Sequence, residues 1–94
     1  MKVYLKIFLP ALPELIGRKE LELEFAGDTV NHLIDHLVAQ YGRKAEQALY
    51  DETGELDPVV QVLVNGEEWI TRERLDTPLQ EGDQIVLLMM MAGG

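Results

Sequence analysis

The sequence predicts an α+β roll, in which one long helix packs across a mixed β-sheet. Two segments near the N-terminus alternate apolar and polar residues, as strands with one buried face do. A single later segment, residues 30–41, has the helical period of 3.6 residues instead. An Asn-Gly pair and a continuous apolar run then predict further strands in the C-terminal half.

The first two predicted strands span residues 2–9 and 19–25. The first places aliphatic side chains at every second position, and the second alternates apolar residues with three glutamates. If the two strands pair antiparallel, the glutamates lie opposite Lys2 and Lys6. Such exposed ion pairs contribute only ~0–1 kcal/mol each, so we expect burial of the other face to stabilise the pairing.

The segment between these strands, residues 10–18, is predicted to be a connector without regular structure. Pro10 and Pro13 interrupt helix and strand, and Gly17 permits a turn. Leu12 and its neighbours make this connector unusually apolar for a loop. We therefore expect the connector to contribute to partner contacts.

The central helix is predicted from apolar residues at positions i, i+3, i+4, i+7, i+8 and i+11. These residues are Val30, Leu33, Ile34, Leu37, Val38 and Tyr41. Asp28 or Thr29 can cap the first turn, and Gly42 stands where a left-handed residue ends a helix. A shorter helical segment is predicted within residues 44–50.

Three strands are predicted in the C-terminal half. Asn65-Gly66, the commonest signal for a two-residue hairpin, joins a strand at residues 59–64 to a short strand at 67–70. The last strand, residues 83–90, is apolar on both faces, which is typical of a central strand.

Composition predicts one domain, residues 1–94, because a chain of this length usually builds a single core. Apolar residues make up 47% and charged residues 27%, a balance that favours a folded core over disorder. The 17 Asp and Glu exceed the 8 Lys and Arg and give a net charge of −9. This charge disfavours nucleic acid and anionic membranes as partners and favours a basic protein surface.

The sequence gives no sign of a membrane span or a leader. The longest apolar run, Ile85 to Ala92, is far shorter than the roughly 20 residues needed to cross a bilayer. Lys6 and Glu14 interrupt any apolar stretch near the N-terminus. We therefore expect a cytoplasmic protein.

Two groups of residues raise the question of a metal site. His32 and His36 have the i, i+4 spacing of two metal ligands, but both lie opposite the apolar stripe of the helix and are expected to face solvent. The Met89–Met91 run offers thioethers for Cu(I). As the end of a strand, the same run would send some side chains into the core and leave others as an adaptable contact surface. We expect no metal site.

The end of the chain, residues 91–94, is predicted to be a flexible tail that reads Met91-Ala92-Gly93-Gly94. Glycines lack Cβ atoms, so this tail can pass through a narrow channel and bring its α-carboxylate to a nucleotide held by another protein. Adenylation by ATP would attach a good leaving group to the carboxylate. A sulfur or amine nucleophile could then displace AMP.

These features together resemble the MoaD/ThiS family of ubiquitin-like sulfur carriers. The resemblance rests on the alternating first strand, the helix start GDTVNHLIDHL, the hairpin VLVNGEEW, the segment LQEGDQIVLL and the final AGG. It implies a β-grasp fold and activation of Gly94 by an E1-like adenylating enzyme that uses ATP. The resulting thiocarboxylate would donate sulfur, with Gly93 giving side-chain-free access. No cofactor bound to the chain itself is implied.

Two partners follow from the resemblance: the E1-like enzyme and an enzyme subunit that accepts the sulfur. The long apolar connector favours the molybdopterin-synthase small-subunit type or the cysteine-biosynthesis type over a thiamin-type carrier. Exposed apolar residues on the sheet, in the connector and at the chain end are predicted to contact these partners. They are Phe8, Leu12, Met89, Met90, Met91 and Ala92.

Two other functions remain open for the same sequence. A ubiquitin-like modifier would be joined through Gly94 to lysines of target proteins, whereas a non-covalent interaction module would not use its glycines at all. We do not expect an enzyme in its own right, because cysteine and serine are absent and no motif suggests a catalytic set.

Overall fold

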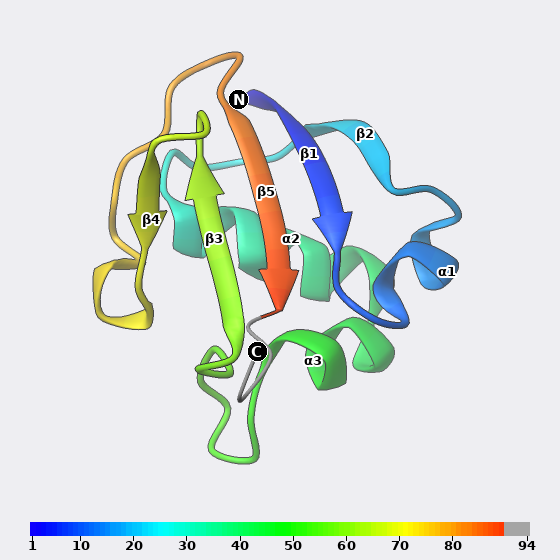
Figure 1. Ribbon diagram of the computed structural model, residues 1–94. Helices are drawn as coiled ribbons and strands as arrows, with labels where there is room; N and C mark the ends of the chain where they lie inside the picture. Colours follow the sequence, from blue (N-terminus) through cyan, green and yellow to red (C-terminus); the bar gives the residue numbers. More distant parts are fainter. Residues whose placement is uncertain (90–94) are drawn as a thin grey trace.

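The computed structural model describes residues 1–89 as a five-stranded mixed sheet with helices packed on one face (Figure 1). The elements in chain order are β1 (Lys2–Phe8), α1 (Leu12–Ile16), β2 (Glu20–Glu24), α2 (Val30–Tyr41), α3 (Arg43–Leu49), β3 (Val60–Val64), β4 (Glu68–Ile70), the 3-10 turn η1 (Arg72–Arg74) and β5 (Gln84–Met89). The strands lie in the order β2-β1-β5-β3-β4. The predicted α+β roll is confirmed.

Strand β5 is the centre of the sheet, as its continuous apolarity predicts. It pairs parallel to β1 on one side and antiparallel to β3 on the other. Ile85 and Leu87 are fully buried on the helix side, and Val86 and Leu88 are half-buried on the opposite, outer face. The strand is therefore apolar on both faces: one face packs in the core, and the other is partly exposed.

Helix α2 packs its apolar stripe against the sheet. Leu33, Ile34 and Leu37 are fully buried, whereas Val38 and Tyr41 lie half-buried at the margins of the stripe. The helix begins at the predicted cap, where Thr29 Oγ1 accepts a hydrogen bond of 3.1 Å from the His32 backbone N–H.

Three further local predictions, the shorter helix, the hairpin turn and the ion pairs, are also confirmed. The shorter helix α3 occupies Arg43–Leu49, and Asn65 and Gly66 have φ angles of 54° and 71°, as the hairpin turn requires. On the outer face, Lys2 Nζ lies 3.8 Å from Glu22 and Lys6 Nζ lies 3.1 Å from Glu20. Among residues 1–89, no helix is long and apolar enough to cross a bilayer.

The prediction that residues 10–18 form an irregular connector is wrong. Helix α1 forms there because Pro13 stands in the first helical turn, where the missing N–H is no loss. Gly17, at φ 93°, ends the helix and donates its backbone N–H to the Pro13 carbonyl at 2.8 Å. Leu12 is 0% exposed, so the apolar side chain at this position of the segment packs in the core.

Candidate functional site

The candidate site is the end of β5, the central strand that leads toward the C-terminal glycines. Near this end Leu88 is paired with Phe8 of β1 and with Gln61 of β3, and Met89 is paired with Val60. Met89 is half-buried and packs against the core. The strand is thus paired on both sides up to Leu88, and Met89 is paired with β3 alone.

The tail itself lies outside the described residues 1–89. The predicted contact and attachment residues that fall there are Met90, Met91, Ala92, Gly93 and Gly94. Their roles stay predictions.

The start of β5 is fixed by the hairpin between β3 and β4. The Gln84 backbone N–H donates to Asn65 Oδ1 at 2.8 Å, and the Asn65 backbone N–H donates to the Gln84 carbonyl at 2.7 Å. Asn65 Nδ2 also donates to Asp83 Oδ1 at 3.0 Å. Because these bonds join the turn to the first residue of β5, they hold the strand in one register against β3.

The outer face of the sheet carries an exposed apolar surface. Phe8 is 56% exposed and Trp69 is 51% exposed, and half-buried side chains lie between them. We call this set the outer apolar surface; it consists of Phe8, Leu63, Trp69, Val86 and Leu88. Cross-strand pairing brings the members together, since Val86 pairs with Leu63, Leu63 with Trp69, and Leu88 with Phe8.

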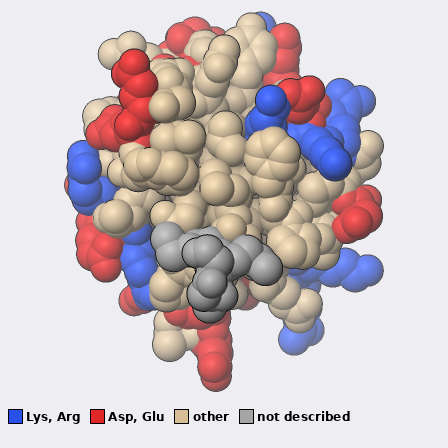
Figure 2. All heavy atoms as spheres, viewed as in Figure 1, with Lys and Arg blue, Asp and Glu red and all other residues tan. Residues whose placement is uncertain are grey.

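Figure 2 shows this face with uncharged side chains over the middle of the sheet and charged side chains gathered around them. An exposed apolar patch with a polar rim is the usual form of a protein-binding surface. It covers β5 and both neighbouring strands, so a partner bound there would lie beside the strand that leads to the tail.

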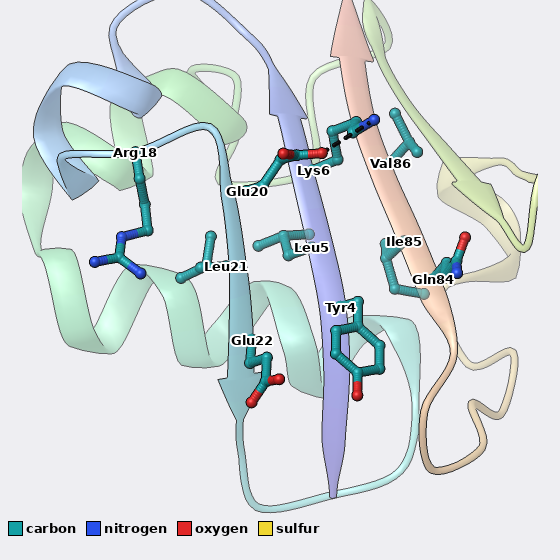
Figure 3. A pocket seen from close by; sticks show the side chains of 10 residues that line it. All are labelled: Tyr4, Leu5, Lys6, Arg18, Glu20, Leu21, Glu22, Gln84, Ile85 and Val86. Carbon is teal, nitrogen blue, oxygen red and sulfur yellow. Dashed lines mark ion pairs between the residues drawn. The ribbon is translucent and has the colours of Figure 1, made fainter.

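A depression lies next to this surface, over β2, β1 and β5 (Figure 3). The ion pair between Lys6 and Glu20 crosses it, and Tyr4 and Gln84 line its other end. Val86 belongs both to this depression and to the outer apolar surface. The depression therefore adds charged and polar contacts at the margin of the apolar patch.

The two predicted contact residues Phe8 and Leu12 differ in exposure. Phe8 is exposed on the sheet as predicted. Leu12 is buried beneath α1 and is not available to a partner, which corrects the prediction for the connector. Val86 and Trp69 were not predicted as contact residues. The alternation of Val86 with two buried neighbours could have indicated that it lies on the outer face.

The two histidines make separate local contacts. The Asp28 backbone N–H donates to His32 Nδ1 at 3.1 Å, so His32 helps to close the turn before α2. The His36 ring is half-buried and lies 6.3 Å from that of Phe25. Within residues 1–89, no group of three or more His, Cys, Asp or Glu side chains is placed to hold a metal ion.

Comparison with known proteins relates the chain to small carriers and modifiers. The pattern of the ThiS family matches residues 7–94. A protein of Archaeoglobus fulgidus assigned as a sulfur carrier is 35% identical over 83 residues, which cover 88% of this chain and 93% of that protein. Small archaeal modifier protein 3 of Haloferax volcanii is 32% identical over 88 residues, covering 93% of this chain and 94% of the relative.

Solved structures give the same relationship. The crystal structure of small archaeal modifier protein 1 (SAMP1) from Haloferax volcanii superimposes with a TM-score of 0.76 at 29% identity, with 100% of both chains covered. A chain in the crystal structure of the Amycolatopsis orientalis BexX/CysO complex matches with a TM-score of 0.72 at 27% identity, covering 98% of this chain and 99% of that one.

Proposed function

The chain belongs to the ThiS/MoaD family of ubiquitin-like sulfur carriers and has their β-grasp fold, and from this we propose that it carries sulfur on the carboxylate of Gly94. The observation that supports this role most directly is the position of β5. The central strand of the sheet is paired with a neighbour on each side, and in the sequence it is followed by residues 90–94, which end in two glycines. A rigid body that presents a side-chain-free end suits an active site in another protein.

The proposed chemistry has two steps. An oxygen of the Gly94 carboxylate attacks the α-phosphorus of ATP in an E1-like enzyme, and pyrophosphate leaves. A sulfur nucleophile then attacks the acyl-adenylate carbon, AMP leaves, and the chain ends in a thiocarboxylate. The chain is a substrate and carrier in this scheme, because the partner supplies the catalytic groups.

Sulfur delivery completes the cycle. The thiocarboxylate sulfur attacks an electrophilic carbon of the acceptor and displaces an oxygen leaving group from that carbon, and water then hydrolyses the acyl–sulfur bond. The sulfur stays on the acceptor and the Gly94 carboxylate is restored. We propose an acceptor subunit of the molybdopterin or cysteine-biosynthesis type, in the ATP-containing cytoplasm.

The outer apolar surface is the proposed docking site for the adenylating enzyme. Exposed aromatic side chains such as Phe8 are the kind that dominate binding energy at protein interfaces. The net charge of −9 would speed the approach of a basic partner. CysO offers a parallel, since it is found in a complex with BexX.

The test is the intact mass of the chain after incubation with candidate adenylating enzymes, ATP and sulfide. We expect an ATP-dependent mass gain equal to the replacement of one oxygen by sulfur. A chain lacking Gly94 is the matched control, because removing one residue withdraws the carboxylate by ~3.5 Å from the reacting geometry. An undiminished mass gain on that shortened chain would contradict the mechanism.

A second function, protein modification through Gly94, is favoured by the names of several relatives. They include small archaeal modifier protein 3 and ubiquitin-related modifier 1 of Schizosaccharomyces pombe. In this case a lysine amine displaces AMP and forms an isopeptide bond. Higher-mass conjugates on a denaturing gel that disappear when Gly94 is deleted would distinguish this outcome from a carrier that returns as free protein. A non-covalent interaction module would function equally well with and without Gly94.

A further inference from the structure

Strand β2 forms one edge of the sheet, and its outward backbone groups are not used by β1. The Ile7 N–H donates to the Lys19 carbonyl at 2.8 Å, and the Phe25 N–H donates to the Met1 carbonyl at 2.9 Å. Since antiparallel pairing alternates, the odd-numbered residues of 19–25 direct their backbone groups toward β1. The backbone groups that point away from the sheet belong to Glu20, Glu22 and Glu24.

The two sides of this edge differ in chemistry. On the outer face, the side chains of Glu20 and Glu22 are 69% and 60% exposed. On the helix side, Leu21 is half-buried, and Figure 3 shows its side chain beside β2 on the side away from β1. The edge therefore offers three N–H donors and three carbonyl acceptors, between a row of glutamates and an apolar margin.

Strand β1 shows which sequence fits such an edge. It places Lys2 and Lys6 against the glutamate row, with ion pairs of 3.8 and 3.1 Å, and turns Val3 and Leu5 toward the helices. The opposite edge of β2 offers the same row of carboxylates and the same backbone repeat. A strand that alternates basic and apolar residues would meet both.

We propose that the free edge of β2 binds an extended segment of a partner protein as an added antiparallel strand. Its basic side chains lie over Glu20, Glu22 and Glu24, and the apolar side chains between them lie beside Leu21. A second copy of this chain does not fit, because pairing two β2 edges would set glutamates opposite glutamates. The glutamates thus select against self-association and in favour of a basic strand.

This binding is separate from the carrier function. Strand β1 lies between β2 and β5, so an added strand at the β2 edge leaves the end of β5 accessible. One chain could therefore contact an extended segment of one protein while its C-terminus is used by another. The edge should bind equally well in a chain that lacks Gly93 and Gly94.

The test uses a short blocked peptide that alternates lysine with valine and extends one residue beyond β2 at each end. A peptide with glutamate in place of lysine is the matched control. We expect the lysine peptide to protect the amides of Glu20, Glu22 and Glu24 from hydrogen exchange. The amides of Leu21 and Leu23 face β1 and should be protected with and without peptide.

Three variants separate the contribution of the glutamate charge from that of the backbone hydrogen bond. Glu22→Gln should weaken binding of the lysine peptide by about threefold, whereas Glu67→Gln, which removes the same charge from an exposed turn, should leave it unchanged. Glu22→Pro removes one outward N–H without touching the β1 pairing and should weaken binding by about tenfold. If the proline variant fails to fold, the glutamine pair still tests the charge.

Three results would overturn the proposal: equal affinity for the lysine and glutamate peptides, exchange of the three outward amides that is unaffected by peptide, or loss of binding when the two terminal glycines are removed. None of them depends on thiocarboxylate formation. Conversely, failure of the adenylation assay would leave peptide binding at this edge unaffected.

Discussion

Asn65 and Asp83 are joined by a hydrogen bond of 3.0 Å, although 17 residues separate them in the chain. Asn65 stands in the turn between β3 and β4, and Asp83 directly precedes β5. Asp83 also accepts the Gln80 backbone N–H at 2.9 Å, so one carboxylate orders the turn before β5 and joins it to the hairpin. The strand that leads to the C-terminus thereby begins at a fixed point.

Asn65→Ala should lower the free energy of unfolding by about 1–3 kcal/mol, because it removes two side-chain hydrogen bonds and places a less tolerant residue at φ 54°. Asn65→Gly keeps the turn geometry and should cost less. Urea denaturation measures both losses. Equal losses would mean that the backbone angle contributes nothing to the difference.

Leu37→Ala should cost about 2–5 kcal/mol, the usual cost of truncating a fully buried leucine. The exposed residue Gln40 of the same helix provides the control, since Gln40→Ala should change stability by less than about 0.5 kcal/mol. Both values come from urea denaturation. A loss at Leu37 as small as that at Gln40 would contradict the packing of α2.

Elements with strong local signals could be predicted from the sequence alone. The glutamate alternation of β2 and the stripe that includes Leu33 and Leu37 each report one buried face. The hairpin turn needs positive φ angles at both central positions, and Asn65 and Gly66 both tolerate them, so these two residues predict the turn. In these cases local preference and tertiary packing agree.

Features that depend on distant contacts could not be predicted. The two prolines hid α1, because Pro13 suits a loop as well as a first helical turn, and the burial of Leu12 that favours the helix is a tertiary contact. The outer apolar surface requires knowing that β1 lies beside β5, a pairing of residues about 80 positions apart. Val86 and Phe8 therefore become one surface only in the folded sheet.

Tyr50 should make stability depend on alkaline pH. Burial, together with the hydrogen bond of 2.9 Å and charge repulsion from Asp35, raises the pKa of the Tyr50 hydroxyl well above its usual value near 10. The folded state then keeps a proton that the unfolded state releases, so this contribution is complete below pH ~10 and is lost as the pH rises further.

Tyr50→Phe should remove this part of the pH dependence and cost about 0.5–1.5 kcal/mol at neutral pH through the lost hydrogen bond. Tyr4→Phe, which removes an exposed hydroxyl from the outer face, is the control for the loss at neutral pH and should change stability there by less than about 0.5 kcal/mol. Urea denaturation measures the slopes from about pH 8 to about pH 11, a range that includes the pKa of a free tyrosine. Identical slopes for Tyr50→Phe and the unchanged chain would refute the assignment.

Gly93→Val should separate stability from activation. Gly93 has no side chain and stands four residues after the end of β5 in the sequence, so the substitution should leave the melting temperature unchanged. It adds a branched Cβ and restricts φ next to the reacting carboxylate, and the adenylation rate should fall about 100-fold. Gly93→Ala is the graded control, with a smaller loss expected. A fall in melting temperature that parallels the fall in rate would point to a folding defect instead.

Phe8→Ala should weaken binding to the adenylating partner by about 10- to 100-fold, because a large exposed aromatic side chain in an interface can contribute much of its binding energy. Phe8→Leu keeps most of the apolar area and should retain most of the affinity.

Added salt should slow association more than it changes dissociation, given the net charge of −9. Binding kinetics that do not respond to salt would count against electrostatic steering.

The pairing of β5 with strands on both sides also determines how the molecule bears mechanical load. Backbone hydrogen bonds in a sheet lie nearly perpendicular to the strands, so a pull along β5 from its C-terminal end loads the rows to β1 and β3 in shear. The rows must then yield together, whereas a peeling force would break them one at a time. Anything tethered through the last residues of this chain is therefore attached to a strand whose two rows of hydrogen bonds resist a pull together.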